Sequence, residues 1–250
     1  MMAIYSVISG ISGAIAGIFP LSLDGHFVFL KKVTQTVYGD RVFHIGNDTV
    51  FLICMGIFIA LFISFYEKIY DIIKTKNFKE IGLCLGFYIP ALLINAFFES
   101  SVMLCIFLIL NIIVVYASDY IEKPSFNGKN SIYLMAVSTF LGGLAGFSEI
   151  ALIFFAGLLT GKKQKQAISS ALTLYTPIIL LKSIVYFIKS CIFGFTLNFG
   201  YSLIVLFVSA LTAVLAIVFL KKSATKRSFR LYAYYLALFA FIAIYTLMKG

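Results

Sequence analysis

Two short polar clusters stand in otherwise apolar sequence, and their side chains are of types that do chemistry. Asp24 and His26 lie close to Ser22, and Glu149 directly follows Ser148. A charged side chain at membrane depth is costly and commonly marks a functional site. Two carboxylates can share a divalent cation, and a hydroxyl or a metal-bound water can then attack an electrophile. These five residues are therefore the candidate catalytic residues, with Asp24 and Glu149 as candidate ligands of Mg2+ or Ca2+ if the protein is an enzyme.

Most of these residues also have a structural interpretation. His26 is suited to cap or bridge at a helix break. Asp24 is suited to cap a helix that begins nearby, and Ser148 or Glu149 to cap another, because short polar side chains accept hydrogen bonds from the free N–H groups of helix starts. Lys182 lies in a separate apolar run. It either reaches toward the membrane surface or pairs with a carboxylate such as Glu149. The sequence alone leaves these alternatives open.

The composition is that of a membrane protein. Of the 250 residues, 62% are hydrophobic and 12% are charged, and the mean hydropathy is +1.03. A soluble chain of this length needs more polar surface. The net charge of +10 comes from short basic loops between apolar runs, so we expect no nucleic-acid partner. A membrane-crossing helix takes about 17–25 residues. Five runs qualify clearly: Val50–Tyr66, Ile81–Phe98, Val102–Ser118, Tyr201–Leu220 and Leu231–Met248. A sixth, about Gln166–Ile188, contains Pro177 and Lys182 and is more polar, so we expect it to pack inside the bundle.

Two further apolar regions, 3–30 and 131–160, are interrupted by polar residues. The first breaks at 19–26, where Pro20 removes a helical hydrogen bond, and the second breaks at 145–149. We predict that each region is a re-entrant helical hairpin, because irregular backbone at membrane depth needs protein or water around it. The backbone of the hairpins is assigned to Gly13, Gly17, Pro20, Gly25, Gly142 and Gly146.

The positions of the basic residues agree with this topology. With six crossings and two re-entrant hairpins, fourteen lysine and arginine residues fall on one face and five on the other. The excess marks the cytoplasmic face, so both termini face outward. The basic loops are 67–80, 119–130, 161–166 and 221–230. Asp40, Arg41, His44 and Asp48 belong to the outer loop 31–49, where we expect them to be solvated.

The two hairpins resemble each other in sequence. Gly13-Ala14-Ile15-Ala16-Gly17-Ile18 is similar to Gly142-Gly143-Leu144-Ala145-Gly146-Phe147, and three apolar runs follow each. The halves 3–118 and 131–248 each cross the membrane an odd number of times. The second half therefore lies inverted in the membrane relative to the first. Inverted repeats with broken helices are typical of transporters, whose site lies near the midplane. We therefore expect one membrane domain, an all-α inverted-repeat bundle of six transmembrane helices and two re-entrant hairpins.

Longer patterns surround both breaks. The first is Gly13-xxx-Gly17-x-Phe19-Pro20-Leu21-Ser22-xx-Gly25-His26, and the second is Ala145-Gly146-Phe147-Ser148-Glu149-Ile150. They resemble the two signatures of the undecaprenyl-diphosphate phosphatases, also called bacitracin-resistance proteins, which are roughly G-V-V-E-G-L-T-E-F-L-P-V-S-S-T-G-H and P-G-F-S-R-S-G. The resemblance implies a phosphatase of the bacterial cytoplasmic membrane. Such an enzyme removes one phosphate from a C55 polyprenyl diphosphate, assisted by a divalent cation, and so recycles the lipid carrier of peptidoglycan synthesis.

The departures from this family fall on its catalytic residues. The first family glutamate is Ala16, the second falls in a gap after Ile18, one serine is Leu23, and the arginine is Glu149. A carboxylate in place of that arginine repels a phosphate.

Two functions stay open. In one, Asp24, His26 and Glu149 build a replacement cation site and the protein is a phosphatase. In the other, the protein binds or transports a polyprenyl phosphate or another lipid without catalysis, and the same three residues serve as proton-coupling groups. Whether the protein forms a homodimer is also left open.

Overall fold

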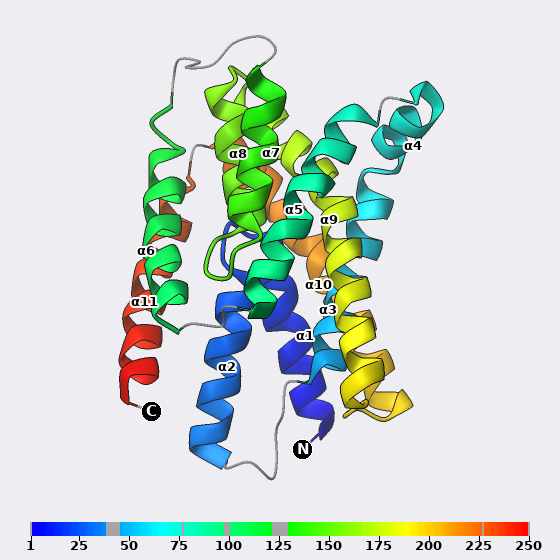
Figure 1. Ribbon diagram of the computed structural model, residues 1–250, viewed down its shortest axis with the longest axis vertical. Coiled ribbons are helices and arrows are strands. Elements are labelled where there is room, and N and C mark those ends of the chain that lie inside the picture. Colours follow the sequence, from blue (N-terminus) through cyan, green and yellow to red (C-terminus); the bar gives the residue numbers. More distant parts are fainter. Residues whose placement is uncertain are drawn as a thin grey trace.

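The computed structural model describes residues 2–38, 46–76, 78–97, 101–121, 130–226 and 228–249. These residues form a bundle of helices and contain no strand (Figure 1). The helices are α1 (Met2–Ile18), α2 (Leu23–Tyr38), α3 (Asn47–Ser64), α4 (Tyr66–Thr75), α5 (Lys79–Phe97), α6 (Ser101–Ala117), α7 (Asn130–Gly142), α8 (Glu149–Leu159), α9 (Gln164–Phe193), α10 (Phe199–Thr225) and α11 (Arg230–Lys249).

The helices confirm an all-α membrane protein. Among the described residues, α3, α9 and α10 are long and apolar enough to cross a membrane on their own. The pair α4 and α5, bent by 104°, makes a fourth crossing if the two are counted as one broken span. All six expected crossings lie on helices, namely α3, α5, α6, α9, α10 and α11. Large apolar side chains such as Phe207, Leu211 and Phe241 are exposed on the outside of the bundle, as lipid contact requires.

Both interrupted regions are pairs of helices with a break between them. Residues 19–22 separate α1 from α2, and residues 143–148 separate α7 from α8. In Figure 1, α1 and α2 extend from their break toward the end of the bundle that carries the N and C labels, and α7 and α8 extend toward the opposite end. Gly146 has a φ of +109°, and a Cβ there would lie 2.6 Å from the Leu104 carbonyl oxygen, so this break requires glycine.

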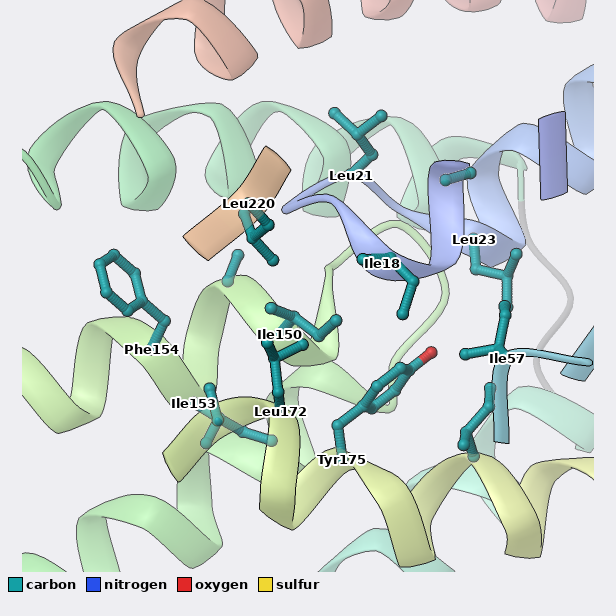
Figure 2. Packing of buried hydrophobic residues seen from close by; sticks show 14 of the residues in the cluster. Ile18, Leu21, Leu23, Ile57, Ile150, Ile153, Phe154, Leu172, Tyr175 and Leu220 are labelled. Atoms are coloured by element: carbon teal, nitrogen blue, oxygen red, sulfur yellow. The ribbon is translucent and has the colours of Figure 1, made fainter. Parts of the chain in front are cut away.

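The core brings the two hairpins against α3 and α9. Gly13 and Gly17 let α1 approach α3 closely, because a Cβ at Gly17 would lie 2.5 Å from Ile57 Cδ1. Figure 2 shows Ile18 of the first hairpin and Ile150 of the second close to Tyr175, which belongs to α9, and all three are part of one cluster. The segments around both breaks therefore share one apolar cluster.

Asp48 is buried, which contradicts the expectation that it is solvated. It is 1% exposed, and its carboxylate accepts hydrogen bonds from the N–H groups of Thr49, Thr196 and Leu197 and from the Thr196 hydroxyl, at 2.6–2.9 Å. These donors replace water, as a buried carboxylate requires. They join the start of α3 to the turn between α9 and α10. Asp40, Arg41 and His44 lie outside the described residues.

Gly142 ends α7 where this helix touches the start of α8. A Cβ there would lie 2.7 Å from Glu149 Cα, a backbone atom. We expect Gly142→Ala to force the two helices apart and to destabilise the protein by about 1–3 kcal/mol, measured by thermal unfolding in detergent. Gly86→Ala on α5 is the matched control, since a Cβ at Gly86 meets no atom within 4 Å. Equal effects of the two substitutions would contradict this packing.

Candidate functional site

In each hairpin the second helix begins directly after a serine. Ser22 Oγ accepts a hydrogen bond from the Gly25 N–H at 3.0 Å at the start of α2. Ser148 Oγ accepts one from the Ala151 N–H at 3.3 Å at the start of α8. Both serines are buried, and both satisfy N–H groups that a helix start leaves free. The capping role that the sequence left open thus belongs to Ser148, and Ser22 has the same role in the first hairpin.

Two asparagines from neighbouring helices support the second break. Asn95 of α5 donates to the Gly143 carbonyl at 2.5 Å and accepts from the Ala145 N–H at 3.0 Å. Asn111 of α6 accepts from the Ser148 N–H at 3.2 Å. Side-chain amides therefore satisfy backbone groups that would otherwise be unpaired at membrane depth. Neither asparagine was among the predicted site residues, although an asparagine within an apolar run is a signal of such a role.

The two hairpins and α9 meet at a buried ion triad, which consists of Asp24, Glu149 and Lys182. Lys182 Nζ donates to Asp24 Oδ2 at 2.8 Å and to Glu149 Oε1 at 3.0 Å. The Tyr88 hydroxyl of α5 donates to the same Glu149 oxygen at 3.1 Å. The Lys182 side chain is 2% exposed, and it is the one buried lysine or arginine among the side chains that the structure describes.

Both carboxylates lie close to the start of a helix. Asp24 lies in the first turn of α2 and Glu149 in the first turn of α8. The positive end of the helix dipole stabilises an anion at such a place. Lys182 therefore bridges two helix starts that would otherwise bring like charges together. Of the two sequence alternatives for Lys182, the structure shows pairing, and it pairs with both carboxylates.

The described side chains do not fit a divalent-cation site here. Ca2+ takes about six to eight oxygen ligands and Mg2+ about six. The described part of the chain contains no group of three or more His, Cys, Asp or Glu side chains that could hold a metal ion. Asp24 and Glu149 do come together from the two hairpins, and the cation between them is the Lys182 ammonium.

His26 contacts α11 and does not bind the carboxylates of the triad. Its Nδ1 lies 2.7 Å from the Ser22 carbonyl oxygen, and its Nε2 lies 3.0 Å from the Tyr235 hydroxyl. Because a carbonyl only accepts, Nδ1 carries the proton, and Nε2 of the neutral ring accepts from Tyr235. The ring also stacks on Phe239 with 3.9 Å between the ring centroids. Nε2 therefore joins α2 to α11, while Nδ1 binds the backbone directly before α2.

Removing the Lys182 charge should destabilise the protein strongly. We expect Lys182→Met to cost about 3–5 kcal/mol, because it leaves the buried Glu149 and the half-buried Asp24 without their partner. The double variant Lys182→Met/Glu149→Gln should recover much of that loss, since it removes the more deeply buried unpaired charge. Thermal unfolding of the purified variants in detergent measures both effects. A double variant no more stable than the single one would contradict the bridging role of Lys182.

Comparison with known proteins extends the hairpin resemblance to the whole chain. No family profile matches the sequence. Curated undecaprenyl-diphosphatases do match it: the protein of Methanococcus vannielii is 24% identical over 96% of this chain and 98% of its own length, and that of Methanococcus maripaludis strain C6 is 23% identical over 95% and 98%. The undecaprenyl-diphosphatase of Caldicellulosiruptor bescii is 24% identical over 94% of both chains. Similarity from end to end, together with the two hairpin signatures, makes this chain a divergent relative of the undecaprenyl-diphosphatase family.

Proposed function

We propose that the protein binds the phosphate or diphosphate head group of a polyprenyl lipid where its two hairpins meet, without hydrolysing the lipid. The ion triad carries this proposal. Lys182 brings a buried ammonium to the two helix starts, and an ammonium is a strong hydrogen-bond partner for a phosphate oxygen. The class of lipid follows from the relatives, which are named as undecaprenyl-diphosphatases.

The groups that hydrolysis needs are engaged elsewhere. The hydroxyls of Ser22 and Ser148 cap helices, and both ring nitrogens of His26 are hydrogen-bonded. Phosphoryl transfer depends on cations that neutralise the transferred group. Glu149 stands where the resemblance places an arginine, and the one nearby cation, Lys182, is already paired with two carboxylates. These features favour binding over catalysis.

Hydrolysis is the second candidate, because four curated relatives are named for it and the chain retains Pro20, Ser22, Gly25 and His26 of the first signature. In that case the protein is a hydrolase that recycles the lipid carrier and contributes to bacitracin resistance. Phosphate release should then fall in Asp24→Asn, His26→Ala and Glu149→Gln.

The proposed topology is an inverted repeat of 3–118 and 131–248 in the cell membrane, with six crossings, two re-entrant hairpins and both termini outside. The opposite directions of the hairpins in Figure 1 support it. So does the repetition of a serine cap followed by a carboxylate in the first helical turn. A site between inverted halves is suited to moving a head group from one face to the other.

Labelling of single cysteines in a cysteine-free background checks this topology. We expect an impermeant thiol reagent added to intact cells to label Phe195→Cys, in the turn between α9 and α10, and not Thr75→Cys at the end of α4. Both residues are exposed in the structure, so burial does not protect either one. Labelling of both positions only after the cells are opened would contradict the proposed orientation.

A direct assay separates the two functions. We expect the purified protein to bind farnesyl phosphate and farnesyl diphosphate, measured by calorimetry in detergent, and to release no phosphate from the diphosphate with or without Mg2+ or Ca2+. The Caldicellulosiruptor bescii relative, assayed in parallel, is the control for the substrate and the conditions. Phosphate release comparable to that control would overturn the binding proposal in favour of hydrolysis. Absence of binding by folded protein would overturn both.

A further inference from the structure

The two carboxylates of the ion triad differ in exposure and in the number of hydrogen bonds that they accept. The Glu149 side chain is 4% exposed, and it accepts hydrogen bonds from both Lys182 and Tyr88. The Asp24 side chain is 15% exposed, and within the described residues it accepts only from Lys182. Its second oxygen, Oδ1, is buried and has no hydrogen-bond partner among these residues. Asp24 is therefore the carboxylate that leaves Lys182 more easily.

A buried hydroxyl next to the triad also has no partner. Tyr175 precedes Lys182 by seven residues on α9, so the two side chains lie on the same face of the helix. Tyr175 is fully buried, and its hydroxyl makes no hydrogen bond to any described group, although it interacts electrostatically with Lys182 and Glu149. Figure 2 shows this hydroxyl pointing from α9 toward Ile18 and Ile57. A buried donor without an acceptor is costly, and an oxygen atom of a bound ligand or of a water molecule can satisfy it.

We propose that a lipid head group exchanges with Asp24 as the anion bound to Lys182, an inference that rests on the proposed function. A phosphate oxygen replaces Asp24 on Lys182 Nζ, and the head group accepts a further hydrogen bond from Tyr175. Asp24 turns toward its exposed side, while Glu149 stays in place. Without lipid, Asp24 is an internal competitor that keeps Lys182 paired and holds the start of α2 against α9.

The charges of the triad favour a head group that replaces Asp24 over one that binds beside both carboxylates. The triad already places two carboxylates around one ammonium. A phosphate that bound beside both would bring a third anion into surroundings of low dielectric constant, where like charges repel strongly. When Asp24 leaves as the phosphate arrives, the number of anionic groups around Lys182 is unchanged. Binding then loosens the start of α2, which is held to α11 through His26 and Tyr235.

Hydrogen–deuterium exchange of the purified full-length protein, with and without farnesyl phosphate, tests this inference. We expect the lipid to speed exchange over 23–30, at the start of α2, and to slow it over 149–156, at the start of α8. Farnesol, which lacks the phosphate, is the matched ligand control and should change neither segment. Asp24→Asn should show faster exchange over 23–30 without lipid and should bind farnesyl phosphate about fivefold or more tightly. Asp71→Asn, at an exposed position of α4, is the matched protein control.

The outcomes separate this inference from the proposed function. Slower exchange at both helix starts on lipid binding, or unchanged affinity of folded Asp24→Asn, would overturn the exchange while leaving the binding function in place. Failure of the folded unmodified protein to bind farnesyl phosphate would overturn the proposed function itself. If Asp24→Asn does not fold, the hydrogen–deuterium exchange of the unmodified protein with and without lipid is sufficient to test whether the head group replaces Asp24.

Discussion

The centre of this protein depends on one interaction, in which the buried ammonium of Lys182 binds the carboxylates of Asp24 and Glu149. A lysine at this depth is tolerable only when its charge is paired, and two carboxylates at facing helix starts are tolerable only with a cation between them. Lys182 therefore fixes where both hairpins break relative to α9. The hydrogen bond from Tyr88 brings α5 into the same arrangement. The apolar cluster around Ile18, Ile150 and Tyr175 encloses these groups and strengthens their interaction by excluding water.

The hairpin breaks are stabilised by side chains that supply hydrogen-bond partners to the backbone. Serine caps satisfy the N–H groups of α2 and α8, and the amides of Asn95 and Asn111 satisfy the backbone of the second break. Gly142 allows α7 and α8 to touch at the turn. Irregular backbone inside a membrane protein persists only with such support. The site is thus built mainly from groups that hold the chain, and few polar groups are left for chemistry on a ligand.

The chain is similar in sequence to the undecaprenyl-diphosphatases along its length, but it differs from the family signatures in the charges at the two breaks. The resemblance leads one to expect glutamates in the first hairpin and an arginine in the second. Here the second hairpin carries Glu149, and the positive charge comes from α9. A site with two carboxylates around one ammonium attracts a phosphate less than an arginine with a metal ion does. This change is the reason why we propose reversible binding of a head group and not its hydrolysis.

Local patterns in the sequence were sufficient to predict the apolar helices, the two breaks and the membrane class, but not α4, most of which lies in the predicted basic loop 67–80. Hydropathy, proline and glycine act on the nearest few residues, so α3, α9 and α10 could be predicted closely. Asp24 and Glu149 were found for the same reason, as charges in apolar surroundings. Only the tertiary structure decided what they contact. Lys182 lies 158 residues from Asp24, His26 binds Tyr235 at a separation of 209, and Asp48 is buried by residues 148 and 149 positions away. A hydrogen bond depends on positions within about 3 Å, and the packing of distant helices, which no local pattern records, brings these groups that close.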